Sequence, residues 1–137
     1  MLRSDDYNSN IVARFPVDFV SETVNLTEAD GALNKLIFTA SEYSPGSVIH
    51  SLIATNNTLS SQTIFLTLGS DEATAFFSFE MTSGQIIDII TELKLITSNV
   101  MFDSGLKLSP ACTFYARVQD IIAAGESVDI TLFGSNY

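Results

Sequence analysis

The feature that most constrains the fold of this chain is a regular succession of short apolar runs from about Leu33 to the C-terminus. Runs rich in β-branched and aromatic residues recur about every ten residues, and a cluster of Gly, Asn, Ser or Pro closes each one. Strands separated by turns at this spacing are typical of an all-β sandwich. The sequence therefore predicts a two-sheet antiparallel β-sandwich with at most one short helix.

The strands expected from this pattern are 15–20, 33–40, 47–55, 63–68, 73–79, 93–97, 100–108 interrupted by a turn, 111–118 and 127–133. This number of strands is enough for two packed sheets. In the second of these strands, Leu36, Phe38 and Ala40 are expected to share one face. Strand pairing is non-local, so a jelly-roll and an Ig-like connectivity both remain open.

One stretch is ambiguous between helix and strand. Ile86, Ile87, Ile89, Ile90 and Leu93 fit the apolar face of a helix, with Ser83 as an N-cap, but the same residues suit a buried strand. We predict a short helix or turn over 84–92 that leads into a strand at 93–97.

The chain divides into an arm and one domain. Residues 1–15 are polar and contain only Ile11, Val12 and Phe15 as apolar anchors. They are interpreted as an extended, flexible N-terminal arm that becomes ordered when a partner holds it. Residues 16–137 are expected to form the β-sandwich domain, because no linker, repeat or low-complexity segment divides them.

Charge and cysteine content restrict the partners and the compartment. Sixteen acidic residues against six scattered basic ones give a net charge of -10, which disfavours nucleic acid and anionic membranes as partners. Cys112 is the single cysteine and lies in an apolar run, so a buried inert thiol and a reducing cytoplasm are expected. The N-terminus resembles no signal peptide, and no apolar stretch is long enough for a membrane helix.

No recognisable catalytic constellation interrupts the strand pattern. His50 is the single histidine, and no ligand-spaced cluster surrounds it, so a hydrogen-bonded or exposed strand histidine is expected. Acidic pairs such as Asp88 with Glu92, and acidic turns at Asp71 and Asp103, are interpreted as solvated surface charge. We therefore expect no enzymatic activity, no catalytic residue, no cofactor and no metal.

Bulky apolar groups on both faces of two strands point to a partner. The runs around Phe65 and Phe77 place such groups on alternate sides, and one side has to be covered by something other than the domain's own core. Together with Ile11, Val12 and Phe15 of the arm, these two residues are the candidate partner-binding residues. A homo-oligomer, dimer or trimer, is expected.

Four segments carry a family resemblance: YSPGSVI at 43–49, IATNNT at 53–58, TIFLTL at 63–68 and VDITLFG at 128–134. Through them, residues 43–137 resemble the small β-sandwich proteins of tailed-bacteriophage virions, particularly capsid cement or decoration proteins. The sequence Asp103-Ser104-Gly105 departs from the Gly-Asp that such proteins often place before a strand.

The resemblance implies a non-enzymatic structural virion protein of jelly-roll or Ig-like fold. Its partner would be the major capsid protein or another virion protein. It would bind the outer capsid surface at subunit junctions, and it would be assembled in the host cytoplasm. The alternatives are a phage neck, tail or fibre-base protein and, from another class, a carbohydrate-binding module. The absence of Trp disfavours that last alternative, since sugar platforms usually need exposed aromatic side chains.

Overall fold

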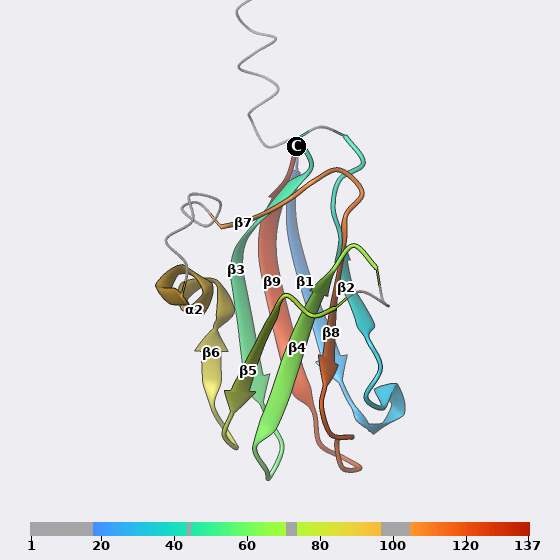
Figure 1. The fold of residues 1–137 in the computed structure, drawn as a ribbon, viewed down its shortest axis with the longest axis vertical. Helices are drawn as coiled ribbons and strands as arrows, with labels where there is room; N and C mark the ends of the chain where they lie inside the picture. Colours follow the sequence, from blue (N-terminus) through green and yellow to red (C-terminus); the bar gives the residue numbers. More distant parts are fainter. Residues whose placement is uncertain (1–17, 44, 71–73, 97–104) are drawn as a thin grey trace, which may run out of the picture.

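The computed structural model describes residues 18–43, 45–70, 74–96 and 105–137, with side chains described up to 92 in the third range. The described residues form two antiparallel sheets packed face to face (Figure 1). Their strands are β1 (Asp18–Leu26), β2 (Lys35–Thr39), β3 (Ser47–Asn56), β4 (Gln62–Leu68), β5 (Phe77–Met81), β6 (Ile86–Asp88), β7 (Leu106–Leu108), β8 (Thr113–Val118) and β9 (Val128–Asn136). The predicted two-sheet sandwich is confirmed.

The strand pairing is that of a jelly roll. One sheet has the order β1-β9-β3-β6, with β7 also on β3, and the other has the order β2-β8-β4-β5. Four antiparallel pairs are therefore nested along the sequence, each enclosing the one before it: β4–β5, β3–β6, β2–β8 and β1–β9. Folding such a long double strand over on itself produces two facing sheets with Greek-key connections. The choice left open by the sequence is therefore decided in favour of the jelly roll.

The edge of the five-stranded sheet beside β3 is interrupted. β6 pairs with β3 at residues 53–55, β7 pairs with it at residues 47–49, and helix α2 (Ile89–Ile96) comes between them in the chain. In Figure 1, α2 lies alongside β3 between the two short strands. β6 and β7 thus occupy two halves of one strand position.

Two expectations for this region were wrong. Residues 89–92 are helical, in line with the prediction, but residues 86–88 form a strand and not the predicted helix or turn, and residues 93–96 belong to α2 and not to a strand. The backbone of β6 pairs with β3 as a ladder, and the carboxylate of Asp88 then accepts hydrogen bonds from the Ile90 N–H and the Thr91 hydroxyl. An Asp that accepts from the first helical N–H groups starts a helix, so the change from strand to helix occurs at this residue.

The core lies between the two sheets and is almost wholly apolar. The largest fully buried side chains are Phe114, Leu26, Ile49, Leu52, Ile64, Leu66, Met81, Ile89, Leu106, Ile122, Ile130 and Leu132. Ten of them come from strands of both sheets at alternate positions, as the pleat of a strand requires, while Ile89 begins helix α2 and Ile122 lies in the connection between β8 and β9. The interior of the roll is therefore filled by its own side chains.

The expected face of β2 was wrong because of a β-bulge. The register with β8 shifts between Leu36 and Phe38, so Ile37, Phe38 and Ala40 are buried while Leu36 points outward. A bulge adds one residue to a strand and reverses the alternation beyond it. The strand expected at 73–79 also begins later, at Phe77.

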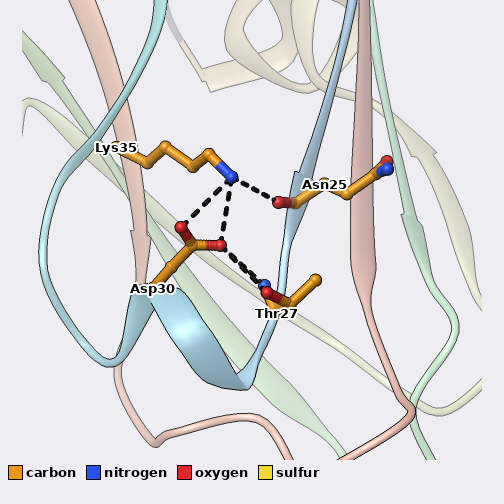
Figure 2. Close-up of polar contacts among 4 residues, drawn as sticks. All are labelled: Asn25, Thr27, Asp30 and Lys35. Atoms are coloured by element: carbon orange, nitrogen blue, oxygen red, sulfur yellow. Dashed lines mark hydrogen bonds and ion pairs between the residues drawn. The ribbon is translucent and has the colours of Figure 1, made fainter.

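The passage from β1 to β2 is secured by a polar cluster around one carboxylate (Figure 2). Thr27 precedes the 3-10 helix η1 (Glu28–Asp30), and the Asp30 carboxylate accepts hydrogen bonds from its N–H and its hydroxyl. Lys35 Nζ lies 3.1 Å from Asp30 and donates to the Asn25 carbonyl at 2.9 Å. The cluster ties the first strand of one sheet to the first strand of the other.

Candidate interaction surfaces

The structure separates the candidate partner-binding residues. Ile11, Val12 and Phe15 lie outside the described residues. Phe77 is half-buried, packs against the core and stacks on Phe79 at a ring-centroid distance of 5.7 Å. Phe65 lies on the opposite, outer side of the same sheet, next to Ser78 of β5. Phe65 is thus placed where a partner could reach it, whereas Phe77 serves the core of its own chain.

The outer face of the four-stranded sheet, called face B, is formed by Leu36, Thr39, Thr63, Phe65, Thr67, Ser78, Glu80, Thr113, Tyr115 and Arg117. The Arg117 guanidinium carbon lies 4.1 Å from the centroid of the Phe65 ring, in a cation–π contact. Leu36 and Tyr115 are register partners beside it. Face B therefore combines aromatic surface with one positive group that is already engaged by its neighbour.

The outer face of the five-stranded sheet, called face A, consists of four rows of cross-strand partners. In order along the strands, the rows are Phe19–Ser135–Val48–Lys107, Ser21–Phe133–Ser51, Thr23–Thr131–Ile53–Asp88 and Asn25–Asp129–Thr55–Ile86. Most of these residues are exposed or half-buried and alternate with buried ones such as Leu52, Ile130 and Leu132, so they point away from the core. Ser135 is itself buried, and exposed His50, at the bulge of β3, contacts its hydroxyl on this face at 3.0 Å. Cross-strand partners lie side by side on one surface, and the rows give the arrangement of the face directly.

Face A is nearly uncharged. Its charged side chains are Lys107 in the first row, Asp88 in the third and Asp129 in the fourth. The remainder is hydroxyl, amide and apolar, and Phe19, Phe133 and Ile86 are exposed large hydrophobic side chains within it. Face A thus has positive charge at one end and negative charge at the other, and it differs in this from the strongly acidic chain as a whole, whose net charge is -10.

Buried polar groups serve the fold. The Asn56 side chain, fully buried, donates to the carbonyls of Ser60, Met81 and Thr82 and accepts from Thr58, joining two turns at one end of the roll. These contacts satisfy the amide on both sides, as a buried polar group requires. The cluster therefore holds the turns together.

The single histidine and the single cysteine each have a hydrogen-bond partner in the described part of the chain. His50 is exposed on β3, and its Nε2 lies 3.0 Å from the Ser135 hydroxyl, in agreement with the expected hydrogen-bonded strand histidine. Cys112 is a free thiol and half-buried, with a contact from Sγ to the Thr113 carbonyl at 3.7 Å, so it is more exposed than expected.

Metal-binding and membrane-spanning features are both missing from the described part of the chain. Its residues bring together no group of three or more His, Cys, Asp or Glu side chains that could hold a metal ion. No helix among them has the length and apolar character needed to cross a bilayer.

Sequence reasoning missed face A because its rows join residues distant in the chain. Thr23 and Thr131, whose hydroxyls lie 3.4 Å apart, are separated by 108 positions. The available signal was the alternation of Asp129, Thr131 and Phe133 with buried residues, which marks an outward side but not its neighbours.

No protein-family model and no curated protein matches this sequence. Among solved structures, a chain of the "Cyanophage Pam1 capsid asymmetric unit" is similar over 90% of this chain and 88% of that chain, with 13% sequence identity and a TM-score of 0.44.

Proposed function

We propose that this chain is a structural component of a bacteriophage virion, and within it a capsid cement or decoration protein that binds the outer shell. The observation that carries the proposal is the jelly-roll connectivity, with an apolar core between the two sheets. Viral capsid domains are among the proteins that use this architecture. The sequence resemblance of residues 43–137 to virion sandwich proteins supports the same assignment.

A cement protein acts by mass action. It binds the assembled lattice and not the free subunits, so its binding free energy adds to the stability of the shell. Many copies on one particle strengthen the lattice without a strong single contact. The net charge of -10 suits docking against a basic protein surface.

Residues 1–15 supply the proposed attachment arm. They precede β1 in the sequence, and their apolar anchors would be ordered on a neighbouring virion subunit. We expect deletion of residues 1–14 to leave the thermal unfolding temperature of the sandwich unchanged and to reduce its occupancy on particles. A full-length variant with Ile11, Val12 and Phe15 each replaced by Ser should lose occupancy similarly. Undiminished occupancy in both variants would contradict the role of the arm.

The proposed function is tested first by quantitative mass spectrometry of purified particles of the source virus. A copy number comparable to that of the major capsid protein is expected for a cement protein. A small, ring-sized number would instead assign the chain to the neck or tail, and its absence from particles would refute a virion role.

A second measurement tests whether the protein stabilises the particle in addition to binding it. Particles stripped of this protein are incubated with the purified chain, and their thermal disruption temperature is compared with that of untreated particles. Restoration of the higher temperature is the expected result. Binding without any change in the disruption temperature would argue against cementing.

A further inference from the structure

We propose that face A is the surface through which two copies of this chain associate, packed face to face with their strands antiparallel. This inference concerns the chain's contact with itself, so it goes beyond the proposed attachment to a shell.

Charge selects the face. Two copies that each carry a net charge of -10 repel one another over most approaches. Face A offers an approach with little like-charge contact, because its second row is uncharged and its acidic residues are confined to the third and fourth rows. Exposed Phe133 and half-buried Ile53 lie in the middle of the face and supply apolar surface to bury.

Side-chain sizes match in the antiparallel arrangement. A two-fold axis that lies in the plane of the face, perpendicular to the strands and between the second and third rows, exchanges the first row with the fourth and the second with the third. Phe133 of one copy then faces Thr131 of the other, and Ile53 faces Ser51. Every contact occurs twice, as an isologous interface requires. Large side chains thus meet small ones across the axis.

Charge also selects the orientation. In the antiparallel arrangement, Lys107 of one copy faces Ile86 of the other, and Asp88 lies one row away, roughly 7 Å along the strand. That separation is within reach of a lysine side chain, so two Lys107–Asp88 contacts form. If the strands of the two copies ran parallel instead, the acidic ends of the two faces would meet, and Asp129 of one copy would lie near Asp129 of the other. Like charges so placed oppose association.

The size of face A sets the expected strength. Four rows spaced by two residues extend roughly 20 Å along the strands, and four strand positions extend about 14 Å across them. This area is below the approximately 800 Å² per partner of a standard stable interface. We therefore expect a reversible dimer whose fraction rises with protein concentration.

The first test is sedimentation velocity of the full chain over a hundredfold range of concentration at low ionic strength. Phe133→Asp is expected to weaken the dimer by about tenfold or more, because it places a charge at the centre of the contact. Leu36→Asp is the matched control, since Leu36 is 48% exposed and Phe133 46%, but on opposite faces of the molecule. The control should dimerise like the unmodified chain, and thermal unfolding establishes that both variants are folded.

The second test concerns the orientation. Lys107→Glu should weaken the dimer, and adding Ile86→Lys to the same chain should restore it, because the two substituted side chains face each other across the axis and then carry opposite charges. Adding Ile121→Lys changes the net charge equally at a site of matched exposure, 65% against 66%, outside face A. This second pair should not restore the dimer.

Three results would overturn the proposal. A chain that stays monomeric at every concentration has no such interface. A dimer equally sensitive to Leu36→Asp and Phe133→Asp, or insensitive to both, does not use face A. A dimer that Phe133→Asp disrupts but that Ile86→Lys does not restore in the Lys107→Glu background excludes the antiparallel arrangement.

Discussion

Along one edge of the five-stranded sheet, β1 pairs with β9 without interruption from Asp18–Asn136 to Leu26–Val128. Along the other edge, β3 is covered by two strands of three residues each, β6 and β7, with α2 between them. In β1 only Leu26 is buried. In the interrupted edge, Ile89, Ile90, Leu106 and Leu108 are all buried.

The two edges are therefore held by different interactions. A continuous ladder distributes its stabilisation over many backbone hydrogen bonds, each contributing only about 1 kcal/mol. A short strand pair cannot do this, so the interrupted edge depends on a few apolar side chains and close backbone contacts. Side-chain substitutions should accordingly lower the free energy of unfolding only slightly at the β1 edge and strongly at the β6–α2–β7 edge.

The largest effect is expected for Gly105→Ala, at the start of β7. An added Cβ would lie 2.2 Å from the Ile49 carbonyl oxygen, and the φ of +118° disfavours any residue with a side chain. We expect a loss of about 4 kcal/mol or more in the free energy of unfolding, measured by chemical denaturation. Gly125→Ala, with φ +80° and no atom within 4 Å, is the control and should cost only about 1 kcal/mol.

The next largest effect is expected for Ile89→Ala, which removes the first apolar anchor of α2. Ile89 is fully buried, so the substitution should lower the free energy of unfolding by about 3 kcal/mol through lost burial and a cavity. Ile86→Ala, three residues earlier and exposed, should stay within about 0.5 kcal/mol of the unmodified chain. Equal losses in the two variants would contradict the dependence of this edge on its anchors.

A smaller effect is expected for Asp88→Ala at the change from strand to helix. The carboxylate of Asp88 accepts from the Ile90 N–H at 3.1 Å and from the Thr91 hydroxyl at 3.0 Å. Loss of such a cap costs about 1 kcal/mol, seen as faster amide hydrogen exchange in α2. Asp88→Ser retains an acceptor and should recover most of the protection. Unchanged exchange in Asp88→Ala would show that the packing of α2 alone fixes its start.

The smallest effect is expected at the β1 edge, for Asp30→Asn in the cluster with Thr27 and Lys35. Burial raises the pKa of Asp30, but the Thr27 backbone hydrogen bond and the hydrogen bond and charge of Lys35 together bring this pKa below its ordinary value. Because the folded-state pKa is the lower one, the stabilisation is full above about pH 4 and is lost as the pH falls through the folded-state pKa.

Asp30→Asn should therefore lower the free energy of unfolding by no more than about 1 kcal/mol at neutral pH, since both side chains of the pair remain partly exposed to solvent. The difference from the unmodified chain should disappear in acid, when denaturation curves are compared between pH 7 and pH 2. A difference that persisted at low pH would mean that the Asp30 charge is not the source of the stabilisation. Glu28→Gln, in the same turn, is the control.

The sequence predicted well those strands whose side chains alternate over several residues. The alternation in 63–68 places Ile64 and Leu66 inward, as β4 confirms. It predicted poorly the strands that are held by neighbours. Most of β1 carries polar residues such as Ser21, Glu22 and Thr23, so nothing local marks it as a strand beyond residue 20. The run Ile86–Ile90 fits both the helical and the strand periodicity, and only the pairing of residues 86–88 with β3 determines that they form a strand.

The candidate surfaces were less predictable than the strands. The alternation around Phe65 and Phe77 indicated that each side of a sheet carries bulky groups, but it could not say which side is outer. The bulge at Ile37 reversed the face of Leu36 without a sequence signal. The rows of face A depend on pairs such as Phe19–Ser135, which only the completed fold brings together.

The central position of β9 also sets the order of events during synthesis. β9 lies between β1 and β3, and Thr23 pairs with a residue made 108 positions later. At about 5–20 residues per second, β1 emerges from the ribosome roughly 5 to 20 s before its partner exists. Throughout that interval β1 and β3 are open edges that can pair with other chains. The five-stranded sheet can thus be completed only after residues 128–136 have been translated.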